Sequence, residues 1–159
     1  MSHRPRFTRA AHDAVIAHVL GEPGHEVGGV LVGGIHDDLG ETHVLGAIAA
    51  LEATSERASV TFTHDAWATV HAALERDHPG REIVGWYHSH PGFGIFLSDH
   101  DLFIHRHFFA RAGQIAHVVD PHAGTEGVFG WTAGEVALLA QRPIAARRAG
   151  AVPSPRNDR

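Results

Sequence analysis

One stretch near the middle of the chain constrains its fold and chemistry more than any other. It has the pattern His-x-His-Pro from His88 to Pro91, then six residues, then Ser-x-x-Asp from Ser98 to Asp101. Two imidazoles and one carboxylate are the usual protein ligands of a catalytic zinc ion, with the fourth position left open for water. The fold must therefore bring Asp101 back to His88 and His90, although Asp101 lies eleven positions after His90.

The residues around this stretch predict a strand, a loop and a helix. A strand is expected over residues 82–88, and its period-two alternation defines two faces. One face is expected to hold Val84, Trp86, His88 and, if the chain stays extended, His90, and the other Ile83, Gly85 and Tyr87. Residues two apart on one face can bind one ion, and Trp86 should pack beneath it. Pro91-Gly92 predicts a loop, and Ser98 begins a helix expected to reach about Arg111.

The rest of the chain predicts a mixed α/β (α+β) domain, in which a central mixed β-sheet is flanked by helices. Further helices are expected from Thr8 to Gly21 and from Thr63 or Asp65 to His78. Strands are expected at 26–35, 42–51, 60–63, 115–119 and 128–131, with a short terminal element at 136–139. The Gly-rich strand at 26–35 should allow another backbone to approach closely.

Composition and charge limit the class of protein. The 159 residues suit one domain with a sizeable core, and the lack of cysteine excludes disulfides, thiolate metal sites and a cysteine nucleophile. Residues 1–141 hold 8 Arg against 17 acidic residues and form the expected domain; residues 142–159 hold 5 Arg against 1 and form an expected mobile, basic, Pro/Arg-rich tail. An acidic domain argues against a nucleic-acid partner. No segment resembles a signal peptide or membrane span, so a cytoplasmic location without membrane contact is expected.

Each part of the central stretch also has an ordinary structural explanation. Ser98-x-x-Asp101 is a helix-capping pattern, and Pro91-Gly92 is a common turn. A His-x-His pair means little alone in a chain with 16 histidines. We expect His100, His105 and His107 to be solvated helix residues, although His105 could face the site, and we expect His117 and His122 to be structural. The coincidence of all parts at one spacing is what favours a metal site.

The stretch resembles the JAMM motif of the JAB/MPN family of zinc metalloproteases. In that family a Glu on an early strand is also part of the catalytic motif. The resemblance covers roughly residues 7–131 and places that Glu at Glu26, in Glu-Val-Gly-Gly. It implies a cytidine-deaminase-like three-layer fold and one Zn²⁺ per chain, held by His88, His90 and Asp101. Glu26 would be the general base and Ser98 the oxyanion donor. All 13 Lys and Arg positions are Arg, and the chain is rich in Ala and Gly. This composition suggests a bacterial source with a GC-rich genome.

The same resemblance implies the reaction and the partner. The substrate would be an amide bond after the Gly-Gly-like tail of a ubiquitin-like protein, cleaved in deconjugation or in precursor processing. Phe93, Ile95 and Phe96 are candidates for the walls of the slot that binds this tail. Two alternatives stay open: a non-catalytic MPN scaffold that binds a partner subunit, and a zinc amidohydrolase that acts on a small substrate.

Overall fold

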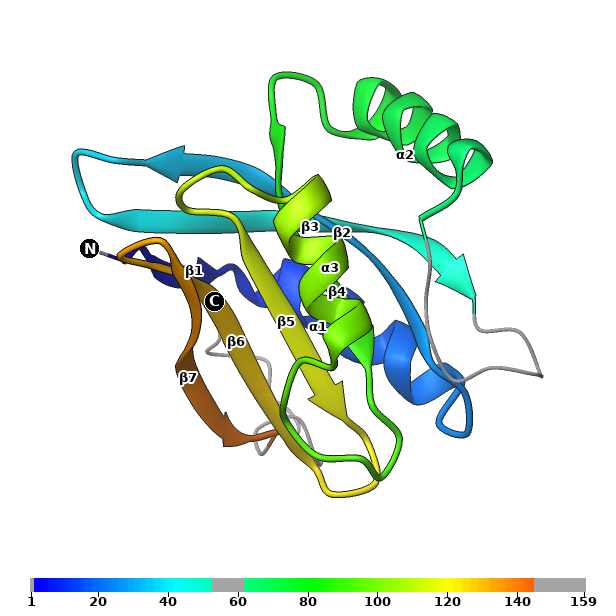
Figure 1. The fold of residues 1–159 in the computed structure, drawn as a ribbon. Coiled ribbons are helices and arrows are strands. Elements are labelled where there is room, and N and C mark those ends of the chain that lie inside the picture. The colour runs from blue at the N-terminus through cyan, green and yellow to red at the C-terminus, as the bar shows by residue number, and fades with distance from the viewer. Residues whose placement is uncertain (1, 53–61, 145–159) are drawn as a thin grey trace, which may run out of the picture.

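The computed structural model describes residues 2–52 and 62–144 and has the expected mixed α/β architecture (Figure 1). The described part of the chain forms three helices and seven strands. The helices are α1 (Arg9–Gly21), α2 (His64–Asp77) and α3 (Asp99–Phe108). The strands are β1 (Arg4–Phe7), β2 (Val27–His36), β3 (Glu41–Glu52), β4 (Glu82–Ser89), β5 (Ile115–Asp120), β6 (Thr125–Thr132) and β7 (Glu135–Pro143). None of these helices has the length and apolar character needed to cross a membrane.

All the strands belong to one mixed sheet with the order β1-β3-β2-β4-β5-β6-β7. The pairs β1–β3 and β4–β5 are parallel, and the remaining pairs are antiparallel. Strand β4 therefore lies at the centre of the sheet, between β2 and β5. Its last residues are held from both sides, which makes its end a rigid place for functional side chains.

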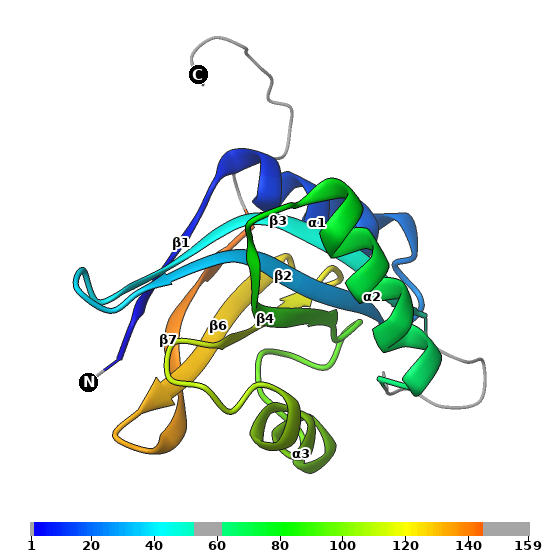
Figure 2. The same cartoon turned by 90° about the horizontal axis from the view of Figure 1, so that it is seen from above.

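Helices cover both faces of the sheet, so the domain has three layers, as Figure 2 shows. On one face, Val15 and Val19 of α1 pack with Leu31 and Tyr87 in one hydrophobic cluster. On the other face, residues of α2 and α3 pack in a second cluster, which includes Trp86. The three-layer arrangement implied by the family resemblance is therefore present.

The helices begin where their capping residues predict. Thr8 accepts a hydrogen bond from the backbone N–H of Ala11 and caps α1, and Thr63 does the same for Ala66 and α2. Helix α2 ends one residue before His78, which precedes Pro79. The strands are formed by Val- and Ile-rich segments whose side chains fill both clusters.

The glycines of β2 have the expected function. A side chain at Gly28 would collide with the carbonyl oxygen of Tyr87, and one at Gly29 with that of Ile48. Only glycine lets β3 and β4 approach β2 this closely. The pairing places Gly28 opposite His88, so the start of β2 lies beside the end of β4.

The predicted alternation along β4 is wrong at its start because the strand contains a bulge. Leu31 pairs with Gly85 and Val32 with Ile83, so Val84 is an extra residue without a direct partner. Val84 consequently joins the cluster of Tyr87, and Ile83 packs against the cluster of Trp86. Beyond the bulge the alternation holds, and the ring of Trp86 stacks on that of His88.

Other boundaries also differ from expectation. Strand β1 was not predicted, because Arg4–Phe7 is short and contains Pro5; pairing with β3 at the sheet edge forms it. Helix α3 ends at Phe108, because the backbone of Phe109 leaves helical geometry, with φ −134° and ψ 50°. The side chain of Phe109 is buried in the core. Strand β7 extends to Pro143, past the expected tail boundary at residue 142. Residues 145–159 lie outside the described ranges, as do residues 60 and 61 of the strand expected at 60–63. The other two residues of that expected strand, Phe62 and Thr63, do not form a strand, because Thr63 is the cap of α2.

Candidate active site

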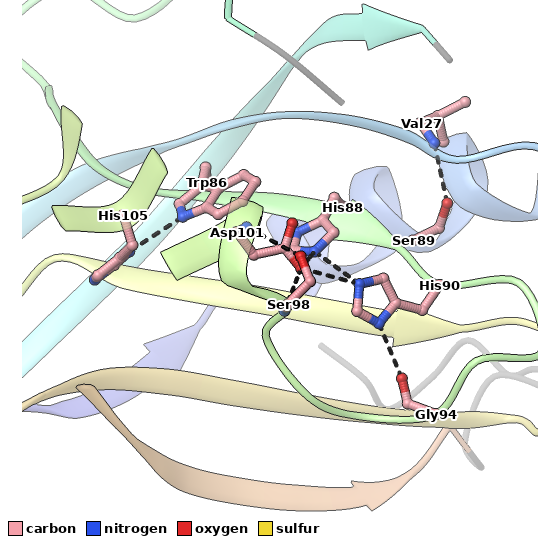
Figure 3. A network of polar contacts seen from close by, with 9 residues as sticks. All are labelled: Val27, Trp86, His88, Ser89, His90, Gly94, Ser98, Asp101 and His105. Carbon is pink, nitrogen blue, oxygen red and sulfur yellow. Dashed lines mark hydrogen bonds and ion pairs between the residues drawn. The ribbon is translucent and has the colours of Figure 1, made fainter. Parts of the chain in front are cut away.

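Three predicted metal ligands converge at the end of β4 (Figure 3). The Nε2 atoms of His88 and His90 lie 3.1 Å apart. Asp101 Oδ2 lies 3.1 Å from the first and 3.2 Å from the second. All three side chains are buried. Two imidazole nitrogens and a carboxylate oxygen of buried side chains thus form a nearly equilateral triangle.

This triangle fits a zinc ion. Zinc–ligand bonds of about 2.0–2.1 Å in a tetrahedral site separate the ligand atoms by roughly 3.3 Å. The Nδ1 atom of His90 lies 3.1 Å from the carbonyl oxygen of Gly94 and must donate to it. Neutral His90 therefore keeps the lone pair of Nε2 available for a metal, which is the usual arrangement of a histidine ligand.

A capping box at the start of α3 fixes Asp101 and Ser98 together. The Ser98 hydroxyl accepts a hydrogen bond from the backbone N–H of Asp101, and the backbone N–H of Ser98 donates to Asp101 Oδ2, both at 3.0 Å. The capping explanation of this pattern is therefore correct. It does not compete with the metal site, because Asp101 Oδ2 also faces both imidazoles. The Ser98 hydroxyl keeps its proton for a further acceptor.

Glu26 lies immediately before β2 and is held beside the triangle. Its buried carboxylate interacts electrostatically with His90 and Asp101. Ser89, the residue between the two histidines, connects the two strands at this point. Its hydroxyl accepts a hydrogen bond from the backbone N–H of Val27 at 3.0 Å and donates one to the carbonyl of His25 at 3.2 Å. The hydroxyl thus contacts the backbone on both sides of Glu26.

The environment gives the carboxylates of Glu26 and Asp101 different pKa values. Burial raises the pKa of Glu26 from 4.5 to about 7, and the charge of Asp101 adds to this rise while His90 opposes it. Burial also acts to raise the pKa of Asp101, but its close contacts with His88 and His90 lower it well below its usual value. One acid is therefore poised to exchange protons near neutral pH, and the other stays ionised, as a ligand must.

His105 is not solvated as expected but fully buried behind the site. Trp86 Nε1 donates a hydrogen bond to His105 Nδ1 at 3.1 Å, and the Trp86 ring stacks on His88 with centroids 4.4 Å apart. Burial lowers the pKa of His105 to about 4, so it stays a neutral acceptor. The need of a buried Trp86 for an acceptor was the sequence signal for this contact. His100 and His107 are exposed, as predicted.

The loop between β4 and α3 is held by Asp120, a residue for which the sequence predicts no function. Asp120, at the end of β5, accepts hydrogen bonds from the backbone N–H groups of Gly92 and Gly94, both at 2.9 Å. It also accepts from His122 and Ala123, so one carboxylate serves two loops. Since Gly94 in turn accepts from His90, Asp120 supports the orientation of a candidate ligand.

The three apolar residues of this loop differ in position. Phe93 and Phe96 are 54% and 45% exposed, and the Phe96 ring lies 4.8 Å from that of His90. Ile95 is half-buried and packs on Gly127 of β6, where an added side chain would collide with it. Phe93 and Phe96 thus remain available to a substrate beside the site, whereas Ile95 anchors the loop to the sheet.

Comparison with known families gives a match to one family model. The model describes the JAB1/Mov34/MPN/PAD-1 ubiquitin protease family and matches residues 8–112. The matched region extends from the cap of α1 to the end of the helix that holds Asp101. It includes all the candidate catalytic and ligand residues.

Individual relatives are similar over parts of the chain. NAD(+) hydrolase TcpA of the archaeon Theionarchaea archaeon is 32% identical over 118 residues, which are 74% of this chain and 34% of that protein. Ubiquitin carboxyl-terminal hydrolase RPN11 of Saccharomyces cerevisiae is 33% identical over 104 residues, 64% of this chain and 33% of that protein. The 26S proteasome non-ATPase regulatory subunit 14 of Caenorhabditis elegans is 48% identical over 46 residues, 15% of its length. The chain therefore spans about a third or less of these relatives.

Proposed function

Because the chain belongs to the JAB1/Mov34/MPN/PAD-1 family, we propose that it is a zinc-dependent peptidase. Its substrate would be the amide bond that follows the C-terminal tail of a ubiquitin-like protein. The observation that supports this most is the convergence of His88, His90 and Asp101 beside the buried Glu26. This combination supplies three zinc ligands and a general base at one place.

The proposed chemistry divides the work among four side chains. A zinc ion held by His88, His90 and Asp101 would polarise the substrate carbonyl and lower the pKa of a water molecule at its open position. Glu26, with its pKa near neutrality, takes a proton from the attacking water and delivers it to the leaving amine.

Ser98 stabilises the negative charge that develops on the substrate carbonyl oxygen. Its hydroxyl oxygen is already held by the backbone N–H of Asp101. The hydroxyl proton can therefore be directed at the carbonyl oxygen without a change of backbone conformation. This pre-orientation is what an oxyanion donor requires.

The loop residues Phe93 and Phe96 support a narrow substrate tail. Both are exposed, and they lie beside His90. Apolar side chains of this kind can contact the backbone of a Gly-Gly tail, which has no side chains that would clash with them. A relative named as a ubiquitin carboxyl-terminal hydrolase favours the same class of substrate.

Two other functions are less well supported. A non-catalytic scaffold has no need of a general base, yet the chain has Glu26 and the complete ligand set. The activity named for TcpA, NAD(+) hydrolysis, belongs to a protein of which the similar region makes up 34%. That activity is therefore not assigned to this region, and it serves as a comparison in the assay.

The test measures zinc content and hydrolysis in the same preparations. Purified protein is analysed for metal and then incubated with ubiquitin-like proteins that bear a fluorescent amine on their C-terminal glycine, or with NAD(+). We expect bound zinc and release of the amine by the parent. After chelation of the zinc, or in Asp101→Asn, release should stop while the fold is kept. Turnover of NAD(+) instead of amide release would contradict the proposal.

A further inference from the structure

A second cluster of buried, metal-binding side chains lies away from the active site. His12 Nε2 is 2.8 Å from Glu126 Oε1 and 3.0 Å from Oε2. His117 Nε2 is also 2.8 Å from Glu126 Oε1. The exposed fractions of His12, His117 and Glu126 are 6%, 0% and 3%. Two imidazoles thus present the same nitrogen to one carboxylate oxygen in the protein interior.

The fold assembles this cluster from three elements on the α1 side of the sheet. His117 of β5 pairs with Tyr87, which belongs to the α1 cluster, and lies two residues from Val119. Glu126 of β6 pairs with Val119, so the two ligands sit diagonally on one face, within reach of a long side chain. Helix α1 covers this face and contributes His12. His88 and Trp86 point to the opposite face, so the two clusters are independent.

The surroundings combine a counter-charge, an apolar wall and a small space. Arg142 Nε donates to Glu126 Oε2 at 3.1 Å, which leaves Oε1 for the two imidazoles. The ring of Phe7 lies 4.9 Å from that of His117 and covers it. Glu126, Phe7 and Arg142 also line a cavity of about 60 Å³. Such a cavity is large enough to hold water molecules beside the carboxylate.

The second ring nitrogen of His117, Nδ1, is buried without a partner among the described residues, while Nε2 faces Glu126. A cation on Nε2 requires the proton of the neutral ring to sit on Nδ1, so Nδ1 is unpaired with or without an ion. The support for an ion therefore comes from the three converging ligand atoms and their burial.

We propose that His12, His117 and Glu126 bind a second divalent cation of the zinc type, which joins α1 to β5 and β6. Two imidazole nitrogens and a carboxylate oxygen are a donor set suited to Zn²⁺ and to Co²⁺ as its probe. The ligand atoms all lie within 4.8 Å of one another. Binding requires neutral imidazoles with free Nε2 lone pairs, and Glu126 as the carboxylate.

The role of this ion is structural. His12 of α1 lies 114 positions from Glu126, whereas His117 and Glu126 lie 9 positions apart on the consecutive strands β5 and β6. Arg142 also brings β7 to the cluster. A cation there would connect the helix to the edge half of the sheet.

The test removes the active-site metal first. In His88→Ala/His90→Ala protein, any specific metal must be bound elsewhere. We expect this variant to bind one equivalent of Co²⁺ with visible d–d absorption, and Zn²⁺ to displace it and raise the thermal unfolding temperature. Side-chain NMR should show that Zn²⁺ shifts the imidazole resonances of His12 and His117 and leaves those of the exposed His71 unchanged.

The matched control adds Glu126→Gln to the His88→Ala/His90→Ala protein. Gln keeps the shape and a hydrogen-bonding oxygen but removes the anionic ligand, and it leaves every exposed histidine in place. The protein with all three substitutions should no longer bind the equivalent of Co²⁺ that His88→Ala/His90→Ala protein binds. Retention of the equivalent after Glu126→Gln would assign it to surface histidines and overturn the proposal. Absence of Co²⁺ uptake by folded His88→Ala/His90→Ala protein, or unchanged His12 and His117 resonances, would also overturn it.

Discussion

At the scale of single residues, Glu26 combines the features expected of a general base with a cost to stability. Its carboxylate is buried, and its pKa is raised from 4.5 to about 7. A group with a raised pKa in the folded state favours folding in its protonated form. This contribution is complete below pH 4.5 and is lost as the pH rises through about 7.

We therefore predict that Glu26→Gln stabilises the metal-free protein at high pH. Above the folded-state pKa, ionised Glu26 opposes folding by an amount on the order of 2 kcal/mol, and neutral Gln does not. Chemical unfolding of chelator-treated parent and variant should show this difference at pH 8. The two proteins should unfold at similar denaturant concentrations at pH 4. Equal stability at pH 8 would show that burial does not raise this pKa.

Ser89 provides a second prediction at this scale. Its hydroxyl contacts the backbone on both sides of Glu26, at Val27 and His25. Ser89→Ala should leave the buried N–H of Val27 unpaired, at a cost of about 1–3 kcal/mol of stability. It should also lower kcat by displacing Glu26, while bound zinc is retained. Unfolding, metal analysis and steady-state kinetics measure these effects.

The control for this prediction is Ser89→Thr. Threonine keeps the hydroxyl and should retain both the stability and the pH profile of hydrolysis. A loss of stability in Ser89→Ala with no change of kcat or of the pH profile would assign Ser89 a structural role alone.

The sequence predicted the candidate site at this scale but not what supports it. The spacing of His88, His90 and Asp101 was enough to predict that they converge. The family resemblance was needed to predict the role of Glu26. The contact of His105 with Trp86 was not predicted, because it depends on which buried donor lacks an acceptor. The position of Ser89 suggested nothing, since its partners lie more than sixty residues away in sequence.

At the scale of elements, the loop from Pro91 to Leu97 depends on Asp120 of β5. The carboxylate accepts from Gly92 and Gly94, and Gly94 accepts from His90. We predict that Asp120→Ala weakens zinc binding by about 10-fold or more, as losses of such supporting contacts do. It should also raise KM, because Phe93 and Phe96 lose their fixed position.

Competition with a chelator measures the zinc affinity of Asp120→Ala. The matched control is Asp38→Ala, an exposed aspartate in the turn between β2 and β3, which should behave as the parent does. A zinc affinity of Asp120→Ala equal to that of the control would show that the loop orients His90 without Asp120.

Local sequence predicted most elements, and long-range pairing decided the rest. Capping residues and Val-rich runs were enough to predict α1, β2 and β5. The bulge at Val84 was not predictable, because it is defined by the register against β2. The four-residue β1 exists because β3 offers it a parallel partner. Both features depend on a partner strand that is distant in sequence, so the residues of the segment alone do not predict them.

At the scale of the whole molecule, metal removal should affect stability and activity together. A ligand that binds only the folded state stabilises it by about 2.7 kcal/mol at a free concentration 100 times its Kd. We predict that zinc raises the unfolding temperature of chelator-treated parent by several degrees. Asp101→Asn should show a smaller rise, because only the cluster on the α1 face remains. Calorimetry at fixed protein concentration measures both, and equal rises would exclude Asp101 as a ligand.

The most direct test of the account compares hydrolysis by parent and Glu26→Gln loaded with equal amounts of zinc. The substrate is a ubiquitin-like protein with a fluorescent amine on its C-terminal glycine, and metal analysis of the same samples confirms the loading. Because the base is removed and the ligands are kept, the rate should fall by about 10²- to 10⁴-fold. A Glu26→Gln protein that hydrolyses the amide at the parent rate would contradict the account.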